Sequence, residues 1–377
     1  MPSHATPDGT RKYASRFFSP TTDPGPANQK TAAGHFRERD GLHFSSIGIG
    51  TYLGEPDADT DRRYTESVVA AVEGGINVID TAINYRFQRS ERSIGDALKK
   101  LAVAGFSREE VFLCTKAGFL TPDGAMPADP ADYFFREYAE RGIFGPHDIA
   151  AGCHCIAPKY LANQLDRSRR NLDVECVDVF YLHNPETQLA EIPRDEFLTR
   201  IRAAFEFCEA AADDGKLQSY GVATWNGFRQ DPGAKDHLSL EALVGIATEI
   251  AGETHRMRFV QMPFNLGMPE ALVRPTQKLG TRSVSMVQAA RPLNITLITS
   301  APTMQGQLAH NLPRFVAESL GLNTDFERAV QFARSAPGIT TALIGMSRLE
   351  HVRANLPLAA VPPATREQIL RIFQETR

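Results

Sequence analysis

The feature that most constrains this chain is a regular alternation of short apolar runs with longer amphipathic stretches. Between the first two runs, Tyr64, Val68 and Val72 recur every four residues, the spacing that places apolar groups on one face of a helix. Alternating strands and helices predict an α/β protein with a parallel sheet. The apolar runs, each followed by sequence of helical character, lie at residues 46–50, 76–80, 111–116, 177–183, 217–224, 258–261, 295–300 and 341–346.

Eight strand–helix units are the number that closes a (β/α)8 barrel, the TIM barrel. The alternative is an open, doubly wound sheet, which normally carries a GxGxxG sequence after its first strand. Here Gly48, Gly50 and Gly54 are one residue out of step with that sequence, and they lie at the strand itself instead of opening a helix. We therefore expect the barrel.

Three segments lie outside a minimal barrel. Residues 1–40 begin with a stretch rich in Pro, Ser, Thr and Gly that has no apolar period, which predicts a flexible or surface-draped N-terminal extension. Residues 41–377 would form the barrel, entered through a short hairpin. After the third strand, segment 117–156 is too long for an ordinary loop, and we expect a lid or a substrate loop on the active-site face. A helix near 366–376 would pack back on the barrel.

Composition excludes several classes of partner. The formal net charge is −4, so no strongly basic surface predicts binding to nucleic acid or to an anionic membrane. No apolar run approaches the roughly 18 residues that a membrane span needs. The five cysteines are scattered and no secretory signal is evident, which favours reduced thiols and a cytoplasmic location. The cluster Cys153, His154 and Cys155 lacks the spaced pairs of a zinc site, so we expect no metal.

Three successive apolar runs end in an ionisable residue: Asp80, Lys116 and His183. Tyr85 follows Asp80 by five residues. Each residue alone also has a structural interpretation, as a turn acid, a solvated loop end or a hydrogen-bonded core residue. In a parallel barrel, however, all strand ends of this kind converge on one rim. The pattern predicts that the four side chains meet in one pocket.

Such a group suits carbonyl reduction. A tyrosine hydroxyl can give a proton to the developing alkoxide, but its ordinary pKa near 10 makes it a slow donor at neutral pH. A neighbouring ammonium, here Lys116, is expected to lower the pKa of Tyr85. Asp80 would keep Lys116 charged and in place. His183 would orient the carbonyl oxygen by a hydrogen bond.

Five blocks of the chain are similar to the aldo-keto reductase family in order and spacing. The resemblance extends over about residues 44–356 and implies a (β/α)8 barrel, NADP(H) bound across the rim, and reduction of an aldehyde or ketone. It also implies that Asp80, Tyr85, Lys116 and His183 form the catalytic group. The blocks are GGINVIDTAINY with SERSIGDAL, VFLCTK, DVFYLHNPE, GKLQSYGVATWNGF and ALIGMSRLEHVRANL.

The resemblance further implies where the cofactor lies. An arginine at a helix N-terminus, here Arg348, suits a phosphate and favours NADP(H), with NAD(H) less favoured. Tyr52, just beyond the first strand, is expected to contact substrate. The implied cofactor-binding residues are Gly50, Thr51, Asp80, Thr224, Gln261, Pro302, Gly306, Leu308, Gly345, Met346, Ser347, Arg348 and Asn355.

The chain departs from the family pattern near the nicotinamide. Ala223 and Thr224 stand where Ser-Asn is usual, and Ser300 stands where a tyrosine usually stacks on the nicotinamide ring. Trp225, or a residue of segment 117–156, is a candidate to fill that space. His351 stands where Arg or Gln is common at the adenosine end.

Three functions follow as hypotheses. The first is NADP(H)-dependent reduction of a small-molecule aldehyde or ketone, with Tyr85 as proton donor. The second is a cofactor-binding regulatory module with little turnover. The third is an alcohol-oxidising pathway enzyme on the same fold. The family implies a monomer or a small homo-oligomer in each case.

Overall fold

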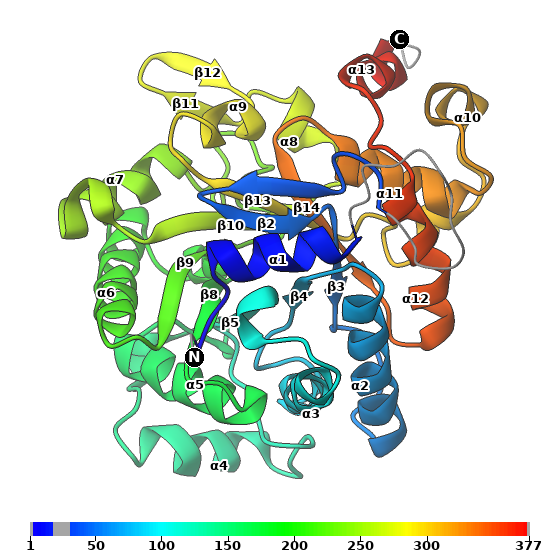
Figure 1. The fold of residues 1–377 in the computed structure, drawn as a ribbon. Coiled ribbons are helices and arrows are strands. Elements are labelled where there is room, and N and C mark those ends of the chain that lie inside the picture. The colour runs from blue at the N-terminus through cyan, green and yellow to red at the C-terminus, as the bar shows by residue number, and fades with distance from the viewer. Residues whose placement is uncertain (1–2, 18–30, 375–377) are drawn as a thin grey trace.

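The computed structural model describes residues 3–17 and 31–374. Their main feature is a closed barrel of eight parallel strands (Figure 1). Each strand coincides with one of the predicted apolar runs, so the predicted (β/α)8 fold is confirmed. Around the ring the strands are β3 (Ile47–Gly50), β4 (Val78–Asp80), β5 (Phe112–Ala117), β8 (Val177–His183), β9 (Leu217–Ala223), β10 (Met257–Pro263), β13 (Thr296–Ser300) and β14 (Ile339–Gly345), which pairs again with β3.

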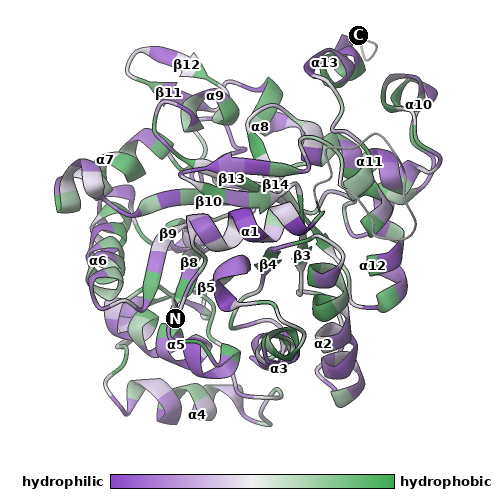
Figure 2. Ribbon diagram, in the orientation of Figure 1, coloured by the Kyte–Doolittle hydropathy of each residue, from purple (hydrophilic) through white to green (hydrophobic). Residues whose placement is uncertain are grey.

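Helices surround the barrel and cover the outer face of the strands (Figure 1). The predicted amphipathic stretch is confirmed: Tyr64, Val68 and Val72 are all fully buried on one face of α2. Figure 2 shows hydrophobic and hydrophilic residues side by side on this helix. The main helices are α2 (Ala58–Glu73), α3 (Arg89–Val103), α5 (Pro158–Leu172), α6 (Arg194–Asp213), α7 (Leu240–Ala251), α9 (Met286–Ala290), α11 (Asp325–Ser335) and α12 (Leu349–Asn355).

A hairpin closes the amino-terminal end of the barrel. It consists of β1 (Phe36–Arg39) and β2 (Leu42–Ser45) and lies in front of the barrel in Figure 1. Phe44 packs edge-on against Phe112, with ring centroids 4.6 Å apart, and both belong to the cluster inside the barrel. The predicted hairpin is therefore present, but its first strand lies before residue 41. With this end plugged, only the opposite rim is left for a deep pocket.

Of the two expectations for the N-terminal extension, flexible or surface-draped, residues 7–17 follow the second: they form helix α1 (Pro7–Phe17), which lies across the same end of the barrel. Tyr13 is fully buried and its hydroxyl donates to the carbonyl oxygen of Val72. A Cβ on Gly9 would lie only 2.3 Å from the carbonyl oxygen of Glu109, so the helix backbone packs directly on the barrel. The buried residues of α1 are Gly9, Thr10, Tyr13 and Ala14, so its buried face follows helical spacing but carries one fully buried large apolar side chain, Tyr13. Residues 18–30 of the predicted extension lie outside the described residues.

Segment 117–156 folds into a small unit of its own. It contains α4 (Pro130–Phe134), a π-helical turn (Phe135–Ala139), β6 (Ile149–Ala150) and β7 (His154–Cys155). Tyr138 is fully buried against Tyr160 of α5, with ring centroids 5.3 Å apart. The aromatic residues of the segment thus hold it against α5.

The remaining elements complete the outer layer. The predicted C-terminal helix is α13 (Arg366–Gln374), which packs through Ile369 and Ile372. Among residues 3–17 and 31–374, no helix is long and apolar enough to span a membrane. The other short elements are α8 (Glu270–Val273), β11 (Gln277–Leu279), β12 (Arg282–Val284) and α10 (Arg314–Leu320).

Candidate active site

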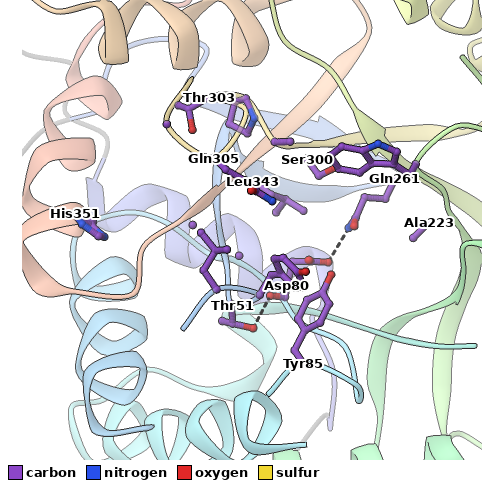
Figure 3. A pocket seen from close by; sticks show the side chains of 18 of the residues that line it. Thr51, Asp80, Tyr85, Ala223, Gln261, Ser300, Thr303, Gln305, Leu343 and His351 are labelled. Atoms are coloured by element: carbon purple, nitrogen blue, oxygen red, sulfur yellow. Dashed lines mark hydrogen bonds between the residues drawn. The ribbon is translucent and has the colours of Figure 1, made fainter. Parts of the chain in front are cut away.

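The carboxyl-terminal rim of the barrel opens into a cavity of about 1,000 Å³. Six strands contribute their last residue to its wall, so the barrel geometry itself brings these positions together. The cavity extends outward to α12, where His351 and Asn355 line it (Figure 3). The six strand-end residues are Gly50, Asp80, His183, Ala223, Ser300 and Gly345.

An ion pair lies at the bottom of this cavity. Lys116 Nζ donates to Asp80 Oδ2 at 2.7 Å and to the carbonyl oxygen of Thr81 at 2.7 Å. The Lys116 side chain is completely buried and that of Asp80 nearly so. A charge removed from water in this way needs a partner at hydrogen-bond distance, and each residue provides one for the other.

Burial and pairing act in opposite directions on this pair. Burial raises the pKa of the Asp80 carboxyl above its usual value, while Lys116 and Gln261 oppose that rise. Burial disfavours the Lys116 ammonium, but the charge of Asp80 and the hydrogen bond to it outweigh that penalty, so the pKa of Lys116 is raised. Lys116 is therefore a cation at neutral pH.

Tyr85 lies in a tightly wound loop directly after β4. Residues 86–88 have positive φ angles of 49°, 57° and 72°, a backbone conformation that costs about 1–2 kcal/mol for each non-glycine residue. Arg86 stabilises this turn from inside: its guanidinium pairs with Asp61 at 3.0 Å and its Nε donates to the hydroxyl of Ser90 at 3.1 Å. The sequence between Asp80 and Ser90 thus places the tyrosine ring over the rim.

The Tyr85 hydroxyl lies 3.5 Å from Lys116 Nζ, and the ring packs edge-on against Tyr52 and His183. Burial raises the pKa of Tyr85, and Lys116 offsets only part of that rise. This direction is opposite to the expected lowering, because the sequence predicts the neighbouring cation but not how deeply the phenol is buried. Tyr85 is consequently a protonated phenol over the whole neutral range.

His183 completes the predicted group at the end of β8. Burial, followed by the charge of Lys116, lowers the pKa of His183 well below 6.5, so the imidazole is neutral. Its Nδ1 lies 3.2 Å from Oδ1 of Asn84, and its ring lies edge-on to Phe119. The predicted convergence of Asp80, Tyr85, Lys116 and His183 is what the structure shows.

His154 supports His183 from behind. Its Nε2 is 2.7 Å from the carbonyl oxygen of His183, which can only accept, so Nε2 carries the proton. Its Nδ1 accepts from the side-chain amide of Gln188 at 2.9 Å. Burial lowers the pKa of His154 to about 4. Both ring nitrogens are thus used in holding β7 against the strand that carries His183.

The structure places most, but not all, of the implied cofactor residues on the cavity wall. Met346 is instead fully buried, Arg348 is exposed at the start of α12, and Leu308 and Ser347 lie between lining residues without lining the cavity themselves. Tyr52, the expected substrate contact, is 58% exposed at the cavity mouth. The residues on the wall are Gly50, Thr51, Asp80, Thr224, Gln261, Pro302, Gly306, Gly345 and Asn355.

The three departures near the nicotinamide line this cavity, as does His351 at the adenosine end. Ala223 offers only a methyl group, and the Thr224 hydroxyl is turned to the buried Glu186, to which it donates at 2.5 Å. Ser300 lies on the wall in Figure 3. Trp225 also lines the cavity and is 42% exposed, so an aromatic face is present although the usual tyrosine is not.

The outer end of the cavity lies against α12. Asn355 is fully buried there, and its Nδ2 donates to the carbonyl oxygen of His351 at 2.8 Å. Its Oδ1 is buried without a hydrogen-bond partner in the described part of the chain. A buried acceptor without a partner costs free energy unless a ligand donates to it.

Several lining residues were not identified from the sequence. Asn84 and Asn184 adjoin the predicted Tyr85 and His183, so their positions were a usable signal. Leu53, Ala301, Thr303, Gln305, Ala309 and Ala354 also adjoin predicted residues, His310 lies two residues after Leu308, and Leu343 lies on β14. Phe119 and Phe326 come from segments that carry no motif.

Comparison with known proteins agrees with this geometry. The sequence model of the Aldo/keto reductase family matches residues 46–241, about half of the chain. The uncharacterized oxidoreductase YqkF of Bacillus subtilis is 22% identical over 354 residues, covering 89% of this chain and 94% of that protein. The NADH-specific methylglyoxal reductase of Escherichia coli is 26% identical over 187 residues, which is 48% of this chain and 49% of that protein.

Solved structures of similar fold include the holo form of an aldo-keto reductase from Bacillus halodurans, with a TM-score of 0.60 and 21% identity over 90% of this chain and 95% of that one. An aldo/keto reductase from Klebsiella pneumoniae in complex with NADP and acetate has a TM-score of 0.58 and 18% identity, covering 89% of this chain and 92% of the other. With the barrel, the rim cavity and the family match in agreement, this chain belongs to the aldo/keto reductase family.

Proposed function

We propose that this protein reduces an aldehyde or ketone with NADP(H) and that Tyr85 is the proton donor. The observation that carries the proposal is the arrangement of Asp80, Lys116, Tyr85 and His183 at one point of the rim cavity. A carbonyl oxygen placed between the Tyr85 hydroxyl and the His183 ring would have a proton donor and a neutral hydrogen-bonding group on either side.

Lys116 and Asp80 act behind the donor. As the proton leaves Tyr85 for the carbonyl oxygen, negative charge develops on the phenolic oxygen, 3.5 Å from the ammonium of Lys116. That ammonium stabilises the charge in a site of low water content, where the interaction is stronger than in bulk solvent. Asp80 keeps the ammonium in place through its 2.7 Å hydrogen bond.

The protonation state of Tyr85 favours reduction over the alcohol-oxidising alternative. Reduction needs the phenol, and burial keeps the pKa of Tyr85 above its ordinary value. Oxidation of an alcohol needs the phenolate as base, which is scarce at neutral pH under these conditions.

The role of His183 depends on which ring nitrogen carries its single proton. To donate to the carbonyl oxygen, Nε2 must be protonated and Nδ1 must accept from the amide nitrogen of Asn84. The side chain of Asn84 can present either its oxygen or its nitrogen to Nδ1. We infer that Asn84 presents the nitrogen when a carbonyl is bound.

The residues present fit a dinucleotide. The cavity runs from Tyr85 to α12, and the unpartnered Oδ1 of Asn355 suits the exocyclic amine of an adenine. Gly50, Thr51 and Gln261 would adjoin the nicotinamide, and a reduced nicotinamide supplies the hydride when bound. Arg348 at the first turn of α12 suits a 2′-phosphate and favours NADP(H) over NAD(H).

The cysteines and segment 117–156 bear on the location of the protein and on its substrate. All five cysteines are free thiols, which supports a cytoplasmic location. Segment 117–156 contributes Phe119 to the cavity wall, and we propose that it limits the substrate on that side. The partner is a small-molecule carbonyl compound.

Titration of the purified protein with NADPH and then with NADH tests the proposal, with quenching of Trp225 fluorescence as the signal. Tight binding with NADPH preferred, followed by turnover of small aldehydes, is the expected result. Binding without turnover on a broad carbonyl panel would favour the regulatory alternative. Binding of neither nucleotide would overturn the proposal.

A further inference from the structure

Gln261 and Asp80 face each other across the mouth of the barrel. Gln261 lies on β10 and Asp80 on β4, separated by β13, β14 and β3 on one side and by β5, β8 and β9 on the other. The two strands are therefore diametrically opposite. Gln261 Nε2 nevertheless donates to Asp80 Oδ1 at 2.7 Å (Figure 3).

This contact fixes the second oxygen of a carboxylate whose first oxygen is already in use. Asp80 Oδ2 accepts from Lys116, and Lys116 lies 3.5 Å from the Tyr85 hydroxyl. With both oxygens held, the carboxylate cannot turn away from the ammonium. A hydrogen bond to a charged group is roughly twice as strong as one between neutral groups.

In the described part of the chain, Gln261 and Lys116 are the side chains that hydrogen-bond to this carboxylate. The charge of Asp80 also acts on Tyr85 in the cavity and on the buried Cys114 and Tyr181, without a hydrogen bond from any of them to the carboxylate among the described residues. The nearby hydroxyl of Thr224 is directed to Glu186. Among residues 3–17 and 31–374, no other uncharged side-chain donor takes the place of Gln261.

We propose that Gln261 is a positioning residue, which bridges the barrel mouth and holds the Asp80 carboxylate so that Lys116 stays directed at Tyr85. This role goes beyond the cofactor contact that the family resemblance implies for Gln261. Its catalytic consequence rests on the proposed function, whereas the bridge itself is a property of the folded protein and can be tested without activity.

A charge swap tests the bridge through the melting temperature at about pH 8. Gln261→Glu places a second carboxylate against Asp80, and Asp80→Asn leaves the Lys116 ammonium without its counterion. In the double variant the amide introduced at position 80 donates to the new carboxylate at position 261, which also restores one negative charge. We expect the double variant to lose about 2 to 4 °C less than the sum of the two single losses.

Gln218→Glu in the Asp80→Asn background is the matched control. Gln218 is a half-buried glutamine on β9 at the opposite end of the barrel, where it donates to the sulfur of Cys176. Its loss should add to that of Asp80→Asn without rescue. Additive losses for Gln261→Glu as well would overturn the bridge.

A milder variant, Gln261→Met, covers the case in which the swapped proteins do not fold. If Gln261 positions Asp80, kcat for carbonyl reduction at saturating NADPH falls by about tenfold to a hundredfold, in addition to any loss of NADPH affinity from the missing nicotinamide contact. Weaker NADPH binding with kcat unchanged would overturn the positioning role. A wild-type protein without any turnover would instead contradict the proposed function, and the melting experiment would still decide the bridge.

Discussion

Replacing Tyr85 by phenylalanine removes one hydroxyl group and leaves the ring where it is. The ring contacts are independent of the hydroxyl: centroid distances are 5.0 Å to Tyr52 and 5.8 Å to His183, and Lys116 Nζ lies 4.9 Å from the ring centre. Within the described residues the hydroxyl itself has one hydrogen bond, at 3.5 Å, which is near the limit for such bonds. We therefore expect the free energy of unfolding to fall by less than about 1 kcal/mol.

The effect on the chemical step should be much larger. A positioned proton donor contributes about 10²- to 10⁴-fold to the rate, which corresponds to roughly 3–5 kcal/mol of the activation free energy. Steady-state reduction of a small aldehyde at saturating NADPH measures kcat, and fluorescence titration measures the Kd of the cofactor. The expected result is a fall in kcat of at least about a hundredfold with cofactor affinity within a few-fold of wild type.

Tyr160→Phe is the control for the loss of a buried tyrosine hydroxyl. Tyr160 lies on α5 outside the cavity and donates to the carbonyl oxygen of Phe119 at 2.8 Å. This variant should lose about 1 kcal/mol of stability and keep its kcat. A Tyr85→Phe protein whose kcat stays within about tenfold of wild type would refute the assignment of Tyr85 as the proton donor.

Three further predictions follow from the geometry of the site. Because burial raises the pKa of Tyr85, kcat for reduction should stay level from about pH 6 to 9 and fall only above about pH 10. The rate of alcohol oxidation should instead rise with pH. A fall in kcat for reduction between about pH 7 and 9 would contradict this prediction. Arg348→Ala should weaken NADPH by about tenfold or more and NADH by less than about twofold in titrations, since only NADPH carries the 2′-phosphate, and equal losses would place that phosphate elsewhere. Asn84→Asp offers only acceptor oxygens to His183, so the single proton stays on Nδ1 and Nε2 cannot donate to the carbonyl oxygen. We expect kcat to fall about tenfold or more at neutral pH and to recover in acid, where the imidazolium carries both protons. A loss that does not depend on pH would argue against control of the tautomer by Asn84.

The strand ends were predictable because the barrel applies one rule to all of them. Once the alternation of apolar runs indicates parallel strands, Asp80, Lys116 and His183 must share a rim, whatever the loops between them do. Tyr85 was predicted to join them because it follows Asp80 by five residues in the loop over the same rim, but the placement of its ring depends on three left-handed residues that follow it. The local sequence alone does not require that turn, because the turn depends on the burial of the Arg86 side chain and on its ion pair with Asp61.

The missed features have a common physical origin in tertiary contacts. Helix α1 buries Gly9, Thr10, Tyr13 and Ala14, a helical spacing in which only Tyr13 is large and apolar. Phe119 and Phe326 reach the cavity from segments far apart in the chain, which no periodicity relates. The pKa of Tyr85 is shifted upward, opposite to the expected direction. Burial causes this shift and, unlike a neighbouring charge, depends on the packing of the whole rim.

The departures near the nicotinamide follow one pattern. Ala223 has no polar side chain where serine is usual, and Ser300 has no ring where tyrosine is usual. Thr224 directs its hydroxyl to Glu186. Under the proposed function, the amide of Gln261 and the indole of Trp225, both on this wall, would meet the cofactor beside Gly50 and Thr51. Because the Gln261 amide also donates to Asp80, any shift that a nicotinamide imposes on it would act directly on the Asp80–Lys116 pair. Under the proposed function, cofactor binding and the setting of the proton donor are therefore coupled through one side chain.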